Sequence, residues 1–193
     1  MLIHSEGKFQ DFLQLHEVGS QQCSEILAAI PYAMEGVSSQ EIYETATLSD
    51  INITTFCRLD WSIPFDTRLI QKYSSQSVRF LFIAEYLHAK VIWWKGWGAY
   101  VGSCNLTDRA CFENYEAGYF IEQDAIERSC FDKDLTIFFD GLRDVAIEPT
   151  DEIFDLLRKQ TDRLANFRSL RRYLSHDFSI ELRSIINGSD FSM

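Results

Sequence analysis

The stretch His88–Glu116 reads HAKVIWWKGWGAYVGSCNLTDRACFENYE. Within it, residues 88–94 and 99–105 are rich in Val, Ile, Trp and Tyr, which favour extended strands. Between these two runs stands Lys95-Gly96-Trp97-Gly98, whose glycines permit a tight reversal of the chain. The stretch therefore predicts a β-hairpin, and we expect the rest of the chain to be arranged around it.

The register of this hairpin decides which polar side chains meet, and a turn symmetric about Gly96-Trp97 is the simplest choice. Antiparallel partners keep a constant sum of residue numbers, so Lys90 then pairs with Ser103. By the same rule His88 pairs with Asn105. All four side chains share one face, with directly opposed residues roughly 5 Å apart. An imidazole, an ammonium, a hydroxyl and an amide in one place suit an anion of the size of a phosphate.

A third strand is predicted at Tyr115–Gln123, which brings Glu116 next to the hairpin. A carboxylate at this position can accept a hydrogen bond from the imidazole of His88, which would fix the tautomer and the basicity of the ring. The simplest alternative is the solvated face of an ordinary hairpin, on which the histidine, lysine and serine have no joint role.

The pattern H-x-K, then G-S-x-N-L-T, then N-x-E resembles the motif of the phospholipase D superfamily. The resemblance covers about Ile51–Gln123, and the agreement of several positions at the family's intervals makes it far more specific than an isolated H-x-K. Many members carry Asp five residues after the motif lysine, where this chain has Lys95. Single-motif nucleases often lack that Asp too, so the departure points away from the two-motif lipases. The matching residues are His88, Lys90, Gly102, Ser103, Asn105, Asn114 and Glu116.

The resemblance implies an α/β fold, a mixed β-sheet flanked by helices on both faces, and a phosphodiesterase that needs no metal and no cofactor. In this family one motif histidine attacks phosphorus to form a phosphohistidine, a second motif histidine protonates the leaving oxygen, and water hydrolyses the adduct. The residues implied as catalytic are His88, Lys90, Ser103, Asn105 and Glu116. Lys90, Ser103 and Asn105 would hold the non-bridging oxygens, and Glu116 would orient His88. Asn114 would hold the loop around the substrate.

This chain contains one such motif, because His4, His16 and His176 lack a lysine two residues later. The resemblance then implies that the second histidine comes from another copy of the chain, in a homodimer.

The substrate class is open at the level of the sequence. Single-motif members are more often nucleases than lipases, which favours nucleic acid, DNA rather than RNA, and a restriction or phage-defence enzyme with partner proteins of such a system. A lipid or small-molecule phosphodiesterase is the first alternative, since Trp93, Trp94 and Trp97 beside the turn could form an apolar rim for a membrane. A non-catalytic regulatory subunit that keeps the motif as a site for an anion or a nucleic acid is the second.

Composition limits these choices. The 193 residues, 46% of them hydrophobic, can bury a core without disulfides or metal, so one domain is predicted over residues 1–193, with a helical C-terminal part at about 132–187. No run approaches the ~18 apolar residues of a membrane span, so we expect a soluble, cytoplasmic protein. Five scattered cysteines without C-x-x-C spacing predict reduced thiols rather than a disulfide framework or a zinc site. A net charge of −11 argues against a protein that binds nucleic acid over its whole surface, so any phosphate-binding surface must be local.

The other elements follow from periodicity and capping signals. Arg58 stands just after a predicted strand, where α/β proteins place ligand contacts; the alternative is a surface arginine paired with Asp60. The basic cluster Phe167–Arg172 could guide a nucleic-acid backbone or simply end a helix. Helices are predicted over Ser20–Ala33, from Ser38, over Asp66–Tyr73, over Asp132–Val145 and from Thr150, and strands over Ile51–Phe56 and Val78–Ile83.

Overall fold

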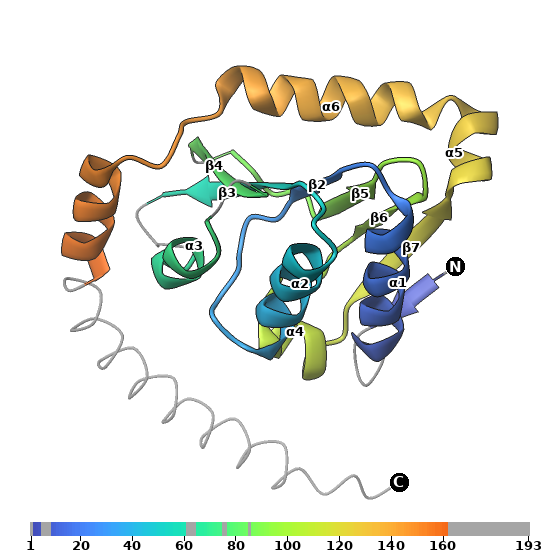
Figure 1. Ribbon diagram of the computed structural model, residues 1–193. Helices are drawn as coiled ribbons and strands as arrows, with labels where there is room; N and C mark the ends of the chain where they lie inside the picture. The colour runs from blue at the N-terminus through green and yellow to red at the C-terminus, as the bar shows by residue number, and fades with distance from the viewer. Residues whose placement is uncertain (1, 5–8, 61–64, 75–76, 85, 162–193) are drawn as a thin grey trace, which may run out of the picture. The chain divides into compact units, whose positions relative to one another are not determined.

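The computed structural model describes residues 2–4, 9–60, 65–74, 77–84 and 86–161 (Figure 1). The chain divides into two compact units, Met1–Thr150 and Asp151–Met193, which are described separately. In the second unit, residues 151–161 form a helix, as the cap at Thr150 predicts. The basic cluster at 167–172 lies outside the described residues, and the single domain expected from the sequence stays a prediction.

The described part of the first unit consists of seven strands and six helices. The strands are β1 (Leu2–His4), β2 (Ile26–Ala29), β3 (Ile53–Leu59), β4 (Val78–Ala84), β5 (Val91–Trp94), β6 (Gly98–Gly102) and β7 (Ala117–Glu122). The helices are α1 (Phe9–Gln22), α2 (Val37–Leu48), α3 (Thr67–Tyr73), α4 (Asp108–Phe112), α5 (Gln123–Ser129) and α6 (Phe131–Val145). Among these described helices, none combines the length and the apolar character needed to cross a membrane.

The strands form one mixed sheet in the order β1-β7-β6-β5-β2-β3-β4. β2, β3 and β4 are parallel, with α2 and α3 as their connections, and the other pairs are antiparallel. Parallel neighbours need such a crossover connection, whereas β5 and β6 are joined directly by a tight turn. The predicted α/β architecture with a mixed sheet is confirmed.

Two adjacent tryptophans of β5 show that both faces of the sheet are covered. Trp93 stacks on Phe139 of α6, with ring centroids 6.2 Å apart, whereas Trp94 lies 6.1 Å from Phe12 of α1. Successive side chains of a strand point to opposite faces, so α6 and α1 must lie on opposite sides, as Figure 1 shows. This double burial explains why the central strands are continuous apolar runs rather than alternating ones.

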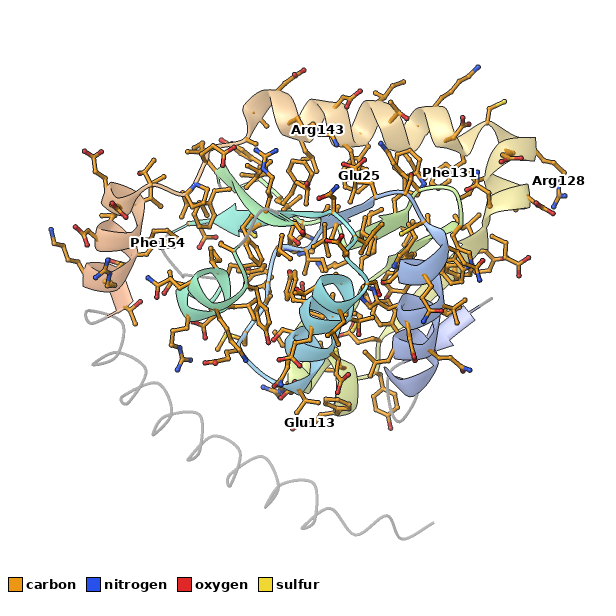
Figure 2. All side chains as sticks on the ribbon, in the orientation of Figure 1. Glu25, Glu113, Arg128, Phe131, Arg143 and Phe154 are labelled. Atoms are coloured by element: carbon orange, nitrogen blue, oxygen red, sulfur yellow. The ribbon has the colours of Figure 1, made fainter. Side chains whose placement is uncertain are left out.

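Ion pairs at the rim of the sheet accompany the apolar contacts. Glu25, which precedes β2, lies 3.6 Å from Arg143 of α6 and 2.8 Å from Lys95 of the hairpin turn. Glu25 and Arg143 are both labelled in Figure 2, where the apolar side chains fill the space between α6 and the sheet. These exposed pairs contribute little stability by themselves.

The hairpin is present, but its predicted register is wrong by one residue. Trp94 pairs with Gly98, so Lys90 aligns with Gly102 instead of Ser103, and the Gly102 amide donates to the Lys90 carbonyl at 3.1 Å. The turn contains three residues rather than four, because Gly96 adopts a φ of +88° and lets the Trp97 amide reach the Trp94 carbonyl. Along the ladder a slip of one residue would put Lys90 and Ser103 on opposite faces.

The helix predicted over Ser20–Ala33 is also wrong. α1 ends at Gln22, and Ile26–Ala29 is β2, a central strand between β5 and β3. Short apolar runs are compatible with either structure, and here burial on both faces decided for the strand. The other predicted elements are confirmed, within a few residues at their ends: α2, β3, α3, β4, β7 and α6.

Candidate active site

The polar residues of the motif gather at one edge of the sheet. Lys90 immediately precedes β5, Ser103 immediately follows β6, and Glu116 immediately precedes β7. The registers Val91↔Val101 and Gly102↔Gly118 bring these three strand ends together. β2 and β3 end at the same edge, since Ala29 pairs with both Val91 and Phe56.

Lys90 lies at the centre of this group. Its ammonium donates to the carbonyl of His88 at 2.8 Å and lies 3.4 Å from Nδ1 of the same residue. The Lys90 side chain is buried, with 8% exposed, whereas His88 is exposed to solvent. The lysine is thus held in place while the imidazole is free to meet a substrate.

Burial and two neighbouring charges determine the pKa of Lys90. Burial lowers it most, and the positive charge of Arg58 lowers it further, while the carboxylate of Glu116 opposes both effects. Arg58 and Glu116 are therefore close enough to interact with the same ammonium. The structure brings together residues from β3, from the start of β5 and from the start of β7.

Glu116 is held by its neighbours from two sides. Ser103 Oγ donates to one carboxylate oxygen, and Asn114 Nδ2 donates to the other at 3.3 Å. Ser103 in turn accepts from the Ala117 amide at 3.1 Å, and its own amide donates to the Ala117 carbonyl at 2.9 Å. Pairing with β7 thus positions Ser103 beside Glu116, whose charge raises the pKa of Lys90 despite the shifted register. The predicted bond from Glu116 to His88 stays a prediction.

Asn105 lies in the loop between β6 and α4. The following Leu106 amide donates to the Tyr32 carbonyl at 3.0 Å, and Thr107 caps α4 by accepting from Ala110. The side-chain oxygen of Asn105 is buried, and no described residue donates a hydrogen bond to it. A buried acceptor of this kind costs free energy unless a donor reaches it, which is consistent with a role in binding.

Arg58 forms the ion pair with Asp60 that the sequence offered as the alternative, and its role in ligand binding stays a prediction. Its Nε lies 2.6 Å from Asp60 Oδ2, an ion pair without the alignment of a hydrogen bond, and its side chain is 23% exposed. The guanidinium also lies 5.9 Å from the ring centroid of Tyr32, which sequence reasoning did not single out. Tyr32 follows β2, and only the alignment of β2 with β3 brings it to this edge, so no local pattern could have revealed it.

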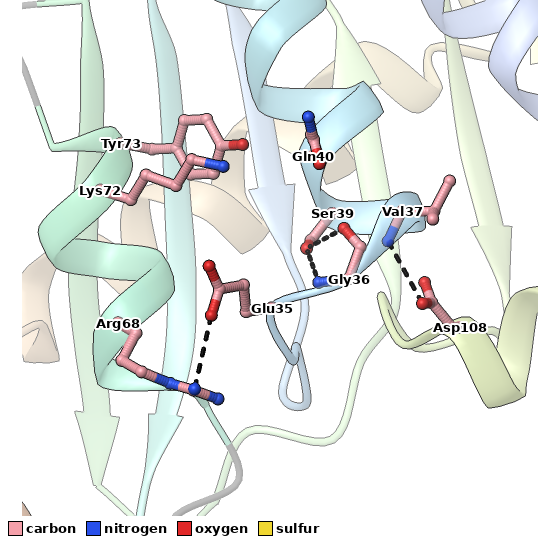
Figure 3. Close-up of a pocket in the computed structure, with 9 residues that line it drawn as sticks. All are labelled: Glu35, Gly36, Val37, Ser39, Gln40, Arg68, Lys72, Tyr73 and Asp108. Carbon is pink, nitrogen blue, oxygen red and sulfur yellow. Dashed lines mark hydrogen bonds and ion pairs between the residues drawn. The ribbon is translucent and has the colours of Figure 1, made fainter.

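A separate pocket of about 400 Å³ lies between α2, α3 and α4 (Figure 3). Arg68 and Glu35 form an ion pair across it at 3.6 Å, and Asp108 accepts hydrogen bonds from the first amides of α2, at Val37 and Ser38. The helix end is thus occupied by a carboxylate of the chain itself. Asp108, three residues after Asn105, fixes the motif loop against α2, and sequence reasoning missed this role.

Comparison with known proteins bears on the fold of this chain. No protein-family model and no curated protein matches this sequence. Among solved structures, NucT from Helicobacter pylori matches with a TM-score of 0.59 at 13% identity, over 77% of this chain and 98% of that one.

Two further structures agree. Nuc from Salmonella typhimurium, a phospholipase D family member, matches with a TM-score of 0.59 at 12% identity, over 78% of this chain and 97% of that one. The phosphatidylserine synthase of Haemophilus influenzae matches with a TM-score of 0.55 at 14% identity, over 87% of this chain and 45% of that one. The architecture and these likenesses show that this chain has the fold of these solved structures, of which Nuc is a phospholipase D family member.

Proposed function

We propose that this chain is a metal-independent phosphodiesterase of the phospholipase D type that hydrolyses nucleic acids. The observation that carries the proposal is the position of Lys90 beside His88, with Nζ 3.4 Å from Nδ1, at the edge where Glu116 and Arg58 also act on the ammonium. The fold and the motif spacing support it, since both are those of enzymes that attack phosphorus with a histidine.

In the proposed reaction, His88 attacks phosphorus and the bond to the leaving oxygen breaks, which yields a phosphohistidine. A second His88, from a partner copy, donates the proton that the leaving oxygen needs. Water then attacks the phosphohistidine, gives up its proton to that second imidazole and releases His88. Lys90 and Ser103 stabilise the negative charge on the non-bridging oxygens, and the buried ammonium is well suited to this because its charge is poorly screened by water.

A nucleic-acid substrate fits the surface better than a membrane does. Trp93 and Trp94 are buried and Trp97 is half-buried, so these tryptophans belong to the core instead of forming an apolar rim. The overall negative charge requires that phosphates be attracted locally, and Lys90 with Arg58 provides two cations at the candidate site. The lipid alternative thus loses the sequence feature that favoured it.

The test is hydrolysis of single- and double-stranded DNA, RNA and a phosphodiester reporter, with and without a strong chelator. We expect cleavage that the chelator does not abolish, and its loss in His88→Ala, a change at an exposed side chain that should leave stability within about 0.5 kcal/mol. Lys90→Met should also be inactive. Lys95→Met is the matched control, because Lys95 lies in the hairpin turn and pairs with Glu25.

Full activity of His88→Ala would exclude the proposed nucleophile. Activity that disappears with chelator and returns with magnesium would point to a metal-dependent mechanism. Binding of inorganic phosphate without any hydrolysis would favour the non-catalytic alternative.

A further inference from the structure

Two thiols lie close together directly behind the candidate site. Sγ of Cys104 and Sγ of Cys111 are 3.8 Å apart, across the loop that joins β6 to α4. Cys104 is partly exposed, whereas Cys111 is buried at 1% exposure. The chain therefore presents one accessible thiol with a second one in contact behind it.

This pair is built into the motif loop. Cys104 stands between Ser103 and Asn105, and both sulfur atoms lie near the carbonyl oxygen of Asn105, at 3.4 Å and 3.6 Å. Cys111 belongs to α4, whose first turn is capped by Thr107. A change in the distance between the two sulfur atoms that side-chain rotation alone does not supply must move the segment that carries Ser103 and Asn105.

The two sulfur atoms are in contact at 3.8 Å but not bonded. A sulfur–sulfur bond is about 2.0 Å long, so the two atoms must approach by roughly 1.8 Å, which side-chain rotation with a small shift of the loop and the five-residue helix α4 can supply. The other three cysteines lie on other elements: Cys23 after α1, Cys57 in β3 and Cys130 between α5 and α6.

We propose that Cys104 and Cys111 form a reversible disulfide by exchange with a small-molecule disulfide such as oxidised glutathione. The thiolate of Cys104 attacks one glutathione sulfur and expels a glutathione thiolate; Cys111 then attacks Cys104 Sγ and expels the second. Two protons pass from the cysteines to the two glutathione thiolates, so the pair is oxidised by two electrons and the glutathione disulfide is reduced. The effect on catalysis rests on the proposed function, whereas the disulfide itself does not.

The surroundings of Cys104 set the rate of this exchange. Its pKa is raised by the hydrogen bond to Cys111, then by burial and by the charge of Glu116; Tyr100 also faces it. Because the thiolate is the attacking species, exchange is slow at neutral pH and accelerates as pH rises. The disulfide removes both S–H groups from the Asn105 carbonyl and draws the loop toward α4, so diester hydrolysis falls.

The experiment equilibrates the protein in buffers of reduced and oxidised glutathione, in a Cys130→Ser background that removes the exposed thiol. Free thiols are alkylated, and peptide mass spectrometry follows the loss of two hydrogens from the pair, while hydrolysis of the diester reporter is measured in parallel. We expect the Cys104–Cys111 disulfide in the oxidised buffers, loss of most of the activity, and recovery with dithiothreitol. Cys104→Ser should keep its activity in the oxidised buffers, whereas Cys111→Ala should stop at the mixed disulfide of Cys104 with glutathione, which the mass measurement detects.

Thiols that stay alkylatable at every ratio, or a disulfide between other cysteines, would overturn the inference. A Cys104–Cys111 disulfide that leaves activity unchanged would refute its effect on the site. If the reduced protein hydrolyses no diester, the proposed function fails, and the mass measurement still decides whether the disulfide forms. Cys104→Ser and Cys111→Ala are both measured, so that if one of them fails to fold, the other still tests the role of the thiol pair.

Discussion

At the scale of single residues, three effects set the pKa of Lys90, and they do not all act in the same direction. Its pKa is lowered by burial and by Arg58 and raised by Glu116. We expect Arg58→Met to raise the pKa of Lys90, because it removes a like charge, and Glu116→Gln to lower it, because it removes an attractive one. Titration of the lysine side chains by NMR with isotopically labelled lysine measures both shifts without requiring any activity.

A matched control is Arg79→Met. It removes an exposed arginine of β4 that pairs with Glu148, and it should leave the pKa of Lys90 unchanged. Movement of the Lys90 pKa in the same direction in Arg58→Met and Glu116→Gln would contradict the arrangement of charges described above.

At the scale of elements, Phe139 is one of two α6 side chains, with Leu135, that are buried in the core against the sheet. Phe139 is fully buried, stacks on Trp93 and lies 5.8 Å from the ring of Phe56. Phe139→Ala should lower the free energy of unfolding by about 3–5 kcal/mol, since it leaves a cavity between the helix and the sheet. Urea denaturation followed by tryptophan fluorescence measures the loss.

Ile137 lies two residues away on the same helix and is 71% exposed, so Ile137→Ala is the control. It should change the free energy of unfolding by less than about 0.5 kcal/mol. Equal losses in the two variants would mean that α6 does not pack as described.

On the opposite face of the sheet, hydrogen bonds of His16 connect α1 to α2 and to β5. Nε2 donates to the Ile42 carbonyl of α2 at 2.9 Å, and Nδ1 accepts from the indole of Trp94 at 3.2 Å, so the ring is a neutral tautomer with both nitrogens used. Burial lowers the pKa of His16 to about 4, against the hydrogen bond to Ile42.

The folded state therefore binds fewer protons than the unfolded state between pH 4 and 6.5, the ordinary pKa of histidine. Stability must then fall as pH decreases through this window, by about 3 kcal/mol for a fully buried ring. Urea denaturation at several pH values in the wild type and in His16→Gln tests this. The variant should be less stable at pH 7, but its free energy of unfolding should depend less on pH between pH 4 and 6.5. An unchanged dependence on pH in this window would mean that other groups cause the acid sensitivity.

At the scale of the whole molecule, the proposed mechanism needs two histidines and the motif supplies one. An isologous dimer meets this need, because residues near a two-fold axis meet their own copies. We expect a homodimer in solution, measured by light scattering or analytical ultracentrifugation. In mixed dimers of wild type with an excess of His88→Ala, activity should fall faster than the wild-type fraction, since each heterodimer lacks one of the two roles.

Activity that stays proportional to the wild-type fraction, in a protein that is monomeric at assay concentration, would refute the shared site. The same mixtures prepared with Lys95→Met should retain full activity, because that residue lies in the hairpin turn away from the candidate site.

The sequence by itself determined which residues match the motif and near which strands they lie. His88 and Lys90 lie close together because only one residue separates them in the chain. The helix predicted over Asp66–Tyr73 is also local, since Asp66 caps α3 by accepting from the Arg68 amide within the first turn. Strands β3, β4 and β7 were also predictable, since β-branched and aromatic runs bounded by polar residues are local signals.

Only the tertiary structure decided how these parts meet. The hairpin register depends on the positive φ of Gly96, and one residue in the turn changes the alignment of every pair beyond it. Ile26–Ala29 became a strand because neighbours on both sides bury it, which no local pattern contains. Glu116 meets Ser103, and Tyr32 reaches Arg58, through pairings between segments distant in the chain. These pairings follow from the energy of the whole sheet rather than from any one stretch.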